Sequence, residues 1–308
     1  MIPSPGQALD KLPDSAFQPE PPQVSYPPDN CPFYSPDRDA NTGRLLAVRP
    51  CKLVDLDGLA VAWFLPDVLS TARQAEIIDS LRLMGGLMAD GIKQNDINDA
   101  RNSSLLFKPA ADCNAAGAGC INISPAWQML GHETEDWPPK ASANWQKNKT
   151  ALSSWVAASR DVFALISAIL SIVHPEQYRQ GILCMKAMAQ KPGVGPFASL
   201  WASAFNAATI IANRETLFHW DRRGRHWWFD ILATCGKYTD GQFSLPATGI
   251  DFHYRPGTVV PFCGNVLCHA VPHCIGERIC LAFYMRDVLH RIAKTGDGSW
   301  SKSIFTKT

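Results

Sequence analysis

The chain has 308 residues, of which 46% are hydrophobic, and its 29 basic and 28 acidic side chains give a formal net charge of +1. This balance excludes a globally basic nucleic-acid binder, although it permits a local basic patch. No apolar stretch approaches the length of a membrane span, and the first residues lack the charged start and apolar core of a signal peptide. We therefore expect a soluble protein that is not secreted and has no membrane partner.

Residues 1–43 contain ten prolines and few aliphatic side chains, which predicts a mostly disordered arm ahead of a single domain over 44–308. Strand patterns follow at 45–48 and 59–64. A helix is predicted through 74–83, with Ser70 as its N-cap and a pair of glycines at its end. From about 88 to 145 the chain is polar and rich in Asn, Gly and Pro. This segment is interpreted as an elaborated loop that contacts a macromolecule, or as a disordered stretch.

Two helices are predicted next, over 150–173 and 175–189. The first has an apolar stripe suited to core packing, and the second begins with a proline and an acid, which suit a first helical turn. After residue 195 the pattern changes to short strands and turns. This order predicts an α+β fold, in which a double-stranded β-helix of the jelly-roll type (about 196–290) is backed by helical support (about 66–190).

Three residues of the β-rich half form the most informative pattern. His219 and Asp221 stand two residues apart, and His269 supplies a distant second imidazole. These are the ligands of the facial triad that holds Fe(II) on one face and leaves the other positions open. In an extended strand, residues i and i+2 point to the same side, so His219 and Asp221 can reach one metal while Trp220 faces away. The alternative is a pair of histidines in an unrelated β protein.

Arg278 follows the second histidine by nine residues. A guanidinium matches a carboxylate bidentately, so this residue suits the distal carboxylate of 2-oxoglutarate. Around these positions the sequence shows an ordered set of short motifs. They are Asn213-Arg214, His219-x-Asp221, Leu245-Pro246-x-x-Gly249, Tyr254-x-Pro256-Gly257-Thr258-Val259-Val260, Val266-Leu267-x-His269, Gly276-x-Arg278 and Tyr284-Met285-Arg286-Asp287.

This ordered set resembles the oxygenase domain of the TET/JBP family of Fe(II)/2-oxoglutarate-dependent dioxygenases, and it looks closest to the fungal, transposon-associated branch. The resemblance implies an oxidoreductase that uses Fe(II), 2-oxoglutarate and O2, with ascorbate as a stimulating reductant. It also implies that the substrate is a methylated base in nucleic acid. On this resemblance the three triad residues are the catalytic metal ligands and Arg278 binds the cosubstrate. Arg214 would touch the other end of 2-oxoglutarate, the alternative being a surface or phosphate-binding arginine.

The substrate side of the resemblance is less complete. Tyr284 keeps the aromatic that stacks on a flipped base, whereas Arg286 stands where the family usually has a histidine. Gly224 stands where members that oxidise 5-methylcytosine usually have Asn or Asp. The choice between 5-methylcytosine oxidation and N6-methyladenine demethylation is therefore open.

Three arginines follow the metal carboxylate closely, at Arg222, Arg223 and Arg225. They predict a positive rim that contacts phosphates at the mouth of the site, the alternative being an ordinary solvated turn. A base inside a duplex must be flipped out to reach buried iron. Methylated DNA is therefore the expected partner, with RNA as an alternative, and the expected protein is a nuclear monomer.

Other classes of protein use the same ligand pattern on the same fold. The alternatives are a protein or small-molecule 2-oxoglutarate hydroxylase, and an inactive oxygenase-fold binder of methylated DNA. Ten cysteines without a secretory signal indicate reduced thiols. Four of them, Cys263, Cys268, Cys274 and Cys280, surround the second histidine but lack the paired spacing of a zinc site, so we expect small buried hydrophobic residues.

Overall fold

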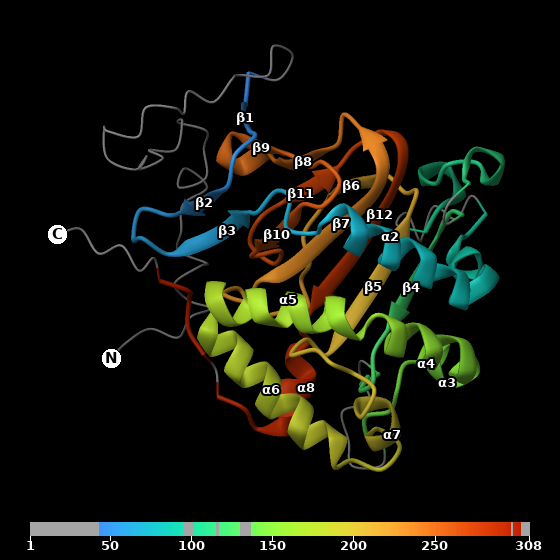
Figure 1. Cartoon of the computed structure of the whole chain (residues 1–308). Coiled ribbons are helices and arrows are strands. Elements are labelled where there is room, and N and C mark those ends of the chain that lie inside the picture. Colours follow the sequence, from blue (N-terminus) through green and yellow to red (C-terminus); the bar gives the residue numbers. More distant parts are fainter. Residues whose placement is uncertain (1–42, 95–101, 115–116, 130–136, 297, 303–308) are drawn as a thin grey trace.

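The computed structural model describes residues 43–94, 102–114, 117–129, 137–296 and 298–302. Two β-sheets face each other, and a group of helices lies along the outer side of the larger sheet (Figure 1). This arrangement confirms the predicted α+β class, a jelly-roll of strands backed by helices. The predicted disordered arm, apart from Gly43, lies outside the described residues.

The smaller sheet has five strands and carries two of the three predicted metal ligands. Its order is β1 (Leu45–Ala47), β9 (Ile250–His253), β8 (Gln242–Leu245), β11 (His269–Val271) and β6 (Thr216–His219). β1 runs parallel to β9, and the other neighbours are antiparallel. Within the described residues β6 therefore forms one edge of this sheet, paired with β11 alone.

The larger sheet has seven strands, all antiparallel to their neighbours. Its order is β2 (Cys51–Val54), β3 (Ala60–Phe64), β10 (Val259–Phe262), β7 (Asp230–Thr239), β12 (Ile275–Tyr284), β5 (Ala207–Ala212) and β4 (Gly119–Ile123). Three of these strands precede residue 196, where the sequence placed the start of the jelly-roll. The β structure is thus wider than predicted.

β4 corrects the interpretation of 88–145 as a loop. Its five residues pair in register with β5, from Gly119 opposite Ala212 to Ile123 opposite Ala208. The same region also holds the end of the 3-10 helix η2 (Leu81–Gly91), the 3-10 turns η4 (Ser104–Leu106) and η5 (Ala110–Asp112), and the start of α3 (Ala143–Lys147). A five-residue strand leaves too short an apolar pattern to stand out from polar surroundings.

The first predicted helix is confirmed at its start and differs at its end. α2 (Thr71–Ser80) begins at Ser70, whose hydroxyl oxygen accepts a hydrogen bond from the Arg73 N–H at 3.2 Å. The chain then tightens into η2 (Leu81–Gly91), which continues beyond the glycine pair. Gly85 kinks this segment with a φ of 55°, a conformation that glycine adopts at little cost.

The predicted long helix over 150–173 is two helices in the structure. α4 (Lys149–Ala158) and α5 (Arg160–Val173) meet at Ser159, where the chain bends by 58°. The sequence does not reveal this break, because both helices bury apolar side chains and their patterns follow one another without interruption. Within the described residues no single helix has the length and apolar character for a membrane span, although α4 and α5 pass that test as a bent pair.

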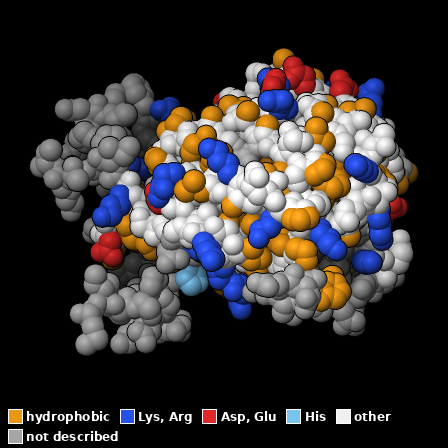
Figure 2. Space-filling model, turned by 90° about the horizontal axis from the view of Figure 1, so that it is seen from below, with side chains coloured by type: hydrophobic (Ala, Val, Ile, Leu, Met, Phe, Trp, Pro, Cys, Tyr) orange, Lys and Arg blue, Asp and Glu red, His pale blue; other side chains and the backbone are white. Residues whose placement is uncertain are grey.

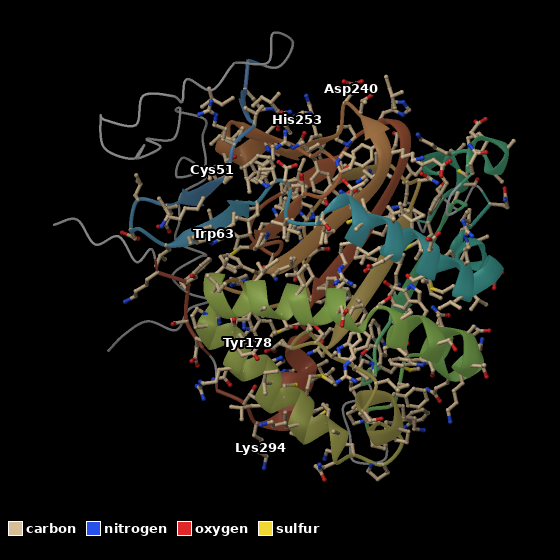
Figure 3. All side chains as sticks on the ribbon, in the orientation of Figure 1. Cys51, Trp63, Tyr178, Asp240, His253 and Lys294 are labelled. Carbon is tan, nitrogen blue, oxygen red and sulfur yellow. The ribbon has the colours of Figure 1, made fainter. Side chains whose placement is uncertain are left out.

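The second predicted helix is confirmed. α6 (Pro175–Ala189) starts with the expected proline and acid, and His174 caps it by accepting a hydrogen bond from the Gln177 N–H at 3.3 Å. Three short segments complete the fold, namely α7 (Gly195–Ala198), η6 (Pro246–Thr248) and α8 (Asp287–Ala293). Figure 3 places Asp240 and His253 at one end of the molecule, and Tyr178 of α6 and Lys294 after α8 toward the other.

β12 separates two environments because its residues alternate. Ile279, Leu281 and Phe283 point into the core beneath the helices, where the Phe283 ring meets the Phe163 ring of α5 at 5.0 Å. The alternate residues, including Arg278 and Tyr284, face the smaller sheet. Aromatic rings also fill part of the space between the sheets, as in the stacked pair Phe64 and Phe252 at 4.9 Å. The polar residues of β12 thus line the remainder of that space.

Lys and Arg side chains are scattered among apolar and neutral ones on the face seen from below, and few acids appear there (Figure 2). The formal charge of +1 over the whole chain does not reveal this local excess of cations.

α8 holds a buried histidine that should make stability depend on pH. His290 is fully buried, its ring lies 4.5 Å from that of Trp228, and its Nδ1 is 2.9 Å from the Thr295 hydroxyl. Burial, and secondarily the charge of Arg225, lower the pKa of His290 from 6.5 to about 3. The folded state therefore keeps the neutral ring, whereas the unfolded chain takes up a proton below pH 6.5.

This stabilisation is complete above pH 6.5 and is lost as the pH falls toward 3. From pH 7 to pH 5 we expect a loss of about 2 kcal/mol in the free energy of unfolding from this group. Urea denaturation at both pH values measures it, with His290→Gln as the non-titrating comparison. An equal loss in both proteins would contradict the prediction.

Candidate functional site

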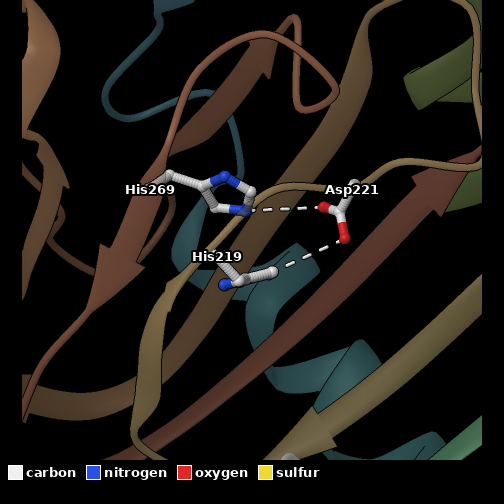
Figure 4. Close-up of side chains that lie close together, drawn as sticks. All are labelled: His219, Asp221 and His269. Carbon is white, nitrogen blue, oxygen red and sulfur yellow. Dashed lines mark ion pairs between the residues drawn. The ribbon is translucent and has the colours of Figure 1, made fainter.

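The structure brings His219, Asp221 and His269 together. His219 ends β6, His269 begins β11, and the two residues are directly opposite each other in the antiparallel pair. The carboxylate oxygens of Asp221 lie 3.7 Å from Nε2 of His219 and 3.4 Å from Nε2 of His269 (Figure 4). One ligand atom from each residue lies within 4.8 Å of the others, the separation expected of side chains that could share a metal ion.

Hydrogen bonds fix the orientation of both imidazoles. Nδ1 of His219 lies 2.7 Å from the carbonyl oxygen of Leu217, and Nδ1 of His269 lies 3.0 Å from that of Leu267. A carbonyl can only accept, so each Nδ1 carries the proton and each Nε2 keeps a lone pair directed toward Asp221. Metal–nitrogen bonds of about 2.1 Å place adjacent ligand atoms about 3 Å apart. The donor set therefore fits one divalent metal ion.

The backbone around Asp221 differs from the predicted strand. β6 ends at His219, and Asp221 is held outside it by its N–H, which donates to the Gly264 carbonyl oxygen at 2.8 Å. The predicted alternation nevertheless persists, because Trp220 is 43% exposed while its two neighbours reach the triad.

A second carboxylate, which sequence reasoning missed, adjoins the triad. Asp230 begins β7, and burial, followed by the negative charge of Asp221, raises its pKa well above the usual value. Gly264 packs against both acids. A Cβ at that position would lie 2.5 Å from an oxygen of Asp230 and 3.3 Å from one of Asp221. The lack of a side chain at Gly264 thus permits the arrangement of the two carboxylates.

Gly264→Ala should therefore displace Asp221 and weaken metal binding. Disturbing the groups that orient metal ligands typically costs about 10- to 100-fold in metal affinity, and we expect a loss in that range. Titration with Fe(II) or Co(II) under anaerobic conditions measures it. Gly86→Ala is the matched control, since a Cβ there has no neighbour within 4 Å. Equal metal affinity of the two variants would show that the glycine is not needed for the site.

Arg278 is a buried cation on β12, six residues before Tyr284. It is 5% exposed, its backbone N–H donates to the Asn213 side-chain oxygen at 3.0 Å, and its Nη2 donates to the Arg214 carbonyl oxygen at 2.5 Å. Its Nε is buried with no hydrogen-bond partner, and no acid among the described residues forms an ion pair with it. A buried cation without a counter-ion is costly, so the site fits a carboxylate ligand.

A cavity of about 180 Å³ opens beside Arg278 and Arg214, between segment 105–109 and segment 272–274. The triad is not part of its lining. Arg214 is 9% exposed, which removes the surface-arginine alternative, and its backbone forms a bridge with Phe107. The two arginines that the resemblance assigned to 2-oxoglutarate, Arg214 and Arg278, therefore line the same cavity.

Tyr284 belongs to a small polar group on the inner side of the larger sheet. Its hydroxyl lies 3.4 Å from that of Thr209 on β5, which donates to the side-chain oxygen of Asn122 on β4 at 2.5 Å. Burial raises the pKa of Tyr284, and the nearby charges of Arg286 and Asp221 act on it in opposite directions. Tyr284 thus lies within electrostatic reach of the triad. Sequence reasoning missed Asn122 and Thr209, which lack a local signal.

Arg286 is only 3% exposed and stacks over Trp127, with its guanidinium carbon 4.0 Å from the ring centroid. Its Nε is buried and has no hydrogen-bond partner among the described residues. Burial lowers the pKa of Arg286, which reflects the cost of holding this charge away from water. Trp127 was not predicted as part of the site. The stack fixes the plane of the guanidinium and leaves donor capacity for a ligand.

The predicted arginine rim needs correction at one position. Arg222 and Arg223 are exposed, as a phosphate contact requires. Arg225 instead forms an ion pair with Asp287 at 2.6 Å, donates to the Gly296 carbonyl oxygen at 2.9 Å and stacks on Trp228. It stabilises the start of α8 and is not a rim residue. A run of charges in sequence cannot distinguish these two roles.

The remaining predicted features are simpler. His273, the alternative second ligand, is exposed and pairs with Glu215 at 2.9 Å, away from Asp221. Cys263, Cys274 and Cys280 are buried and Cys268 is half-buried, all as free thiols. Among the described residues, the triad is the one group of His, Cys, Asp and Glu side chains with metal-binding proximity.

Comparisons with known proteins agree with this geometry. The family model Tet_JBP, described as the oxygenase domain of the 2OGFeDO superfamily, matches residues 132–287. The solved structure of NgTET1 in complex with 5mC DNA is similar with a TM-score of 0.54 and 15% identity, over 80% of this chain and 79% of that chain. That likeness concerns the fold. No curated protein matches in sequence.

Two further solved structures are similar over smaller parts of the chain. One is an oxidoreductase of the 2OG-Fe(II) oxygenase family from Burkholderia pseudomallei, with a TM-score of 0.23 and 17% identity over 32% of this chain and 54% of that chain. The other is the viral collagen prolyl hydroxylase from Paramecium Bursaria Chlorella virus-1, with a TM-score of 0.23 and 13% identity over 27% and 59%.

Proposed function

We propose, from the premise that this chain belongs to the Tet_JBP family of oxygenase domains in the 2OGFeDO superfamily, that it oxidises the methyl group of a methylated base in DNA. The chain is a 2-oxoglutarate-dependent dioxygenase, and the superfamily implies Fe(II) and 2-oxoglutarate. The observation that carries the proposal is the triad of His219, Asp221 and His269, whose ligand atoms lie together as one metal ion requires.

Each residue of the site has a defined part in this proposal. Fe(II) with 2-oxoglutarate and O2 supplies the oxidation of a methyl C–H bond. His219, Asp221 and His269 would hold the iron on one face, and Arg278 would bind the distal carboxylate of 2-oxoglutarate. Arg214 supports Arg278 through its carbonyl oxygen. The distal carboxylate of 2-oxoglutarate would thus bind to an arginine whose position is already fixed by hydrogen bonds.

The base would lie between the triad and the residues at the end of β12. A base in a duplex must leave the stack to reach them, and Tyr284 offers a ring against which it can rest. Arg286 presents N–H donors side by side, a pattern that matches the adjacent N3 and O2 acceptors of cytosine. The methylated edge of adenine instead alternates an acceptor with an N–H donor. Arg286 therefore favours 5-methylcytosine over N6-methyladenine.

The wider biological assignment rests on the same proposal. NgTET1 was solved in complex with 5mC DNA, which supports nucleic acid as the partner. Nuclear location, a monomeric state, stimulation by ascorbate and placement in the fungal, transposon-associated branch remain parts of the proposal. RNA remains the alternative nucleic acid.

Mass spectrometry of oligonucleotides incubated with the protein, Fe(II), 2-oxoglutarate and ascorbate tests the function. DNA of one sequence carrying 5-methylcytosine, N6-methyladenine or no methyl group, and the matching methylated RNA, give the comparison. We expect hydroxymethylcytosine in amounts that follow succinate formation. Succinate without oxidation of any oligonucleotide, together with hydroxylation of a peptide or small molecule, would overturn the proposal.

A further inference from the structure

Three large apolar side chains next to the metal ligands are exposed. Leu217 is 55%, Phe218 57% and Trp220 43% exposed, and all belong to β6 or the residues just after it. Large apolar side chains that gather at a surface usually mark an interaction site, whereas scattered ones do not. In this case they adjoin a catalytic residue on the edge strand of the smaller sheet.

The alternation of the chain divides these residues into two sides. His219 and Asp221 point toward the triad, so Phe218 and Trp220 point to the opposite side, and Arg222 follows in the turn beyond β6. We call Phe218, Trp220 and Arg222 the β6 strip. The guanidinium carbon of Arg222 lies 5.6 Å from the Trp220 ring centroid, which places a cation directly beside an aromatic surface. One short segment thus carries metal ligands on one side and an aromatic, cationic strip on the other.

We propose that the β6 strip binds the nucleic-acid strand that flanks the target base, with one base stacked on Phe218 and another on Trp220. The inference rests on the proposed function and names the surface that would position its substrate. Aromatic rings stack on any base, and a neighbouring arginine contacts the phosphates between the bases.

The spacing of the two rings indicates which form of nucleic acid fits. Two residues of extended chain span about 6.8 Å, twice the rise of about 3.4 Å between stacked bases in a strand of duplex. Bases that rest on both rings must therefore be separated from each other. The strip should bind single-stranded or locally opened DNA, and it should bind intact duplex less well on this flank.

The charge of the strip favours nucleic acid over a protein partner. Arg222 and Arg223 are exposed beside the rings, while the acids nearest in sequence are engaged elsewhere. Asp221 belongs to the triad, and Glu215 pairs with His273. A phosphate backbone at the β6 strip would thus contact arginines, and the nearest acids in sequence would not repel it.

The test compares binding of single-stranded DNA by the full chain and by Phe218→Ala/Trp220→Ala. Oligonucleotides with 5-methylcytosine and 2-aminopurine at a flanking position report both affinity and stacking. Each stack lost should weaken binding about 5- to 150-fold, without changing the salt dependence. Arg222→Ala should instead lower the log–log salt slope by about 0.7. The conservative variant Phe218→Tyr/Trp220→Phe should retain binding and the 2-aminopurine signal.

Ile172→Ala is the matched control, because this side chain is 74% exposed on α5 and its loss should leave DNA affinity unchanged. If the wild type oxidises DNA but the double alanine variant binds it with unchanged affinity, the inference is overturned while the proposed function stands. The surface would then suit a protein partner. If the wild type oxidises no nucleic acid, the proposed function itself is overturned.

Discussion

His219→Ala, Asp221→Ala and His269→Ala should each abolish dioxygenase turnover and lower the affinity for Fe(II) by more than about 100-fold. Loss of groups that merely orient metal ligands already costs about 10- to 100-fold, and each substitution here removes a ligand outright. Only two donors of the triad would remain, and among the described residues no other group of three His, Cys, Asp or Glu side chains has metal-binding proximity. Anaerobic Fe(II) titration and succinate formation measure the two effects.

The controls separate loss of metal from loss of fold. His273→Ala should keep wild-type activity, since its side chain is 66% exposed and pairs with Glu215. His269 packs against Phe262, with ring centroids 4.6 Å apart, so its alanine variant also opens a cavity. His269→Gln fills most of that space, and thermal unfolding of both variants shows whether the domain is intact. Activity retained in His269→Ala and lost in His273→Ala would mean that the second ligand was assigned wrongly.

Two residues of the triad, His219 and Asp221, could be predicted because their signal is local. Two residues apart on an extended chain means the same side, whatever the rest of the fold does, and Asp221 reaches His219 even though β6 ends before it. The start of α6 was equally local, because Pro175 fixes the first turn. Features of this kind depend on a few neighbouring residues and are therefore visible in sequence.

The features that were missed depend on contacts between distant segments. Asn122 and Thr209 meet only because β4 pairs with β5, and Trp127 meets Arg286 across more than 150 residues of chain. The role of Arg225 was predicted wrongly for the same reason, because it also depends on a distant segment. Its charge run predicted a phosphate rim, but Asp287, far along the chain, holds the guanidinium. The break at Ser159 escaped because α4 and α5 share one apolar pattern.

The two residues proposed to contact the base combine both kinds of signal. The resemblance identified Tyr284 and Arg286 by their distance from Arg278, while the structure added the ring beneath Arg286 and the hydroxyl beside Tyr284. An arginine where the family has a histidine is a departure in sequence. In the structure the same arginine is a buried donor whose plane is fixed, so the departure would change the pattern of hydrogen bonds offered to the proposed base.

Arg278→Ala should weaken binding of 2-oxoglutarate about 30-fold to several thousand-fold. Losing one partner of a buried, hydrogen-bonded charge pair typically costs about 2–5 kcal/mol, which corresponds to that range. The side chain is 5% exposed and its Nε has no partner among the described residues, so a bound carboxylate would be its main counter-ion. Calorimetric titration of 2-oxoglutarate into metal-loaded protein measures the change, with thermal unfolding as a check on folding.

Two substitutions test whether charge or geometry matters in this cosubstrate site. Arg278→Lys keeps the charge but loses the planar fork, so its affinity for 2-oxoglutarate should lie between those of the wild type and Arg278→Ala. Arg255→Ala is the matched control, because Arg255 is tied to Asp67 in an exposed ion pair. Unchanged affinity in Arg278→Ala would move the role to another cation, and Arg214 is the next to test because its backbone already contacts Arg278. Arg278 would then not be part of the cosubstrate site, and 2-oxoglutarate would have to reach the triad from a different cation.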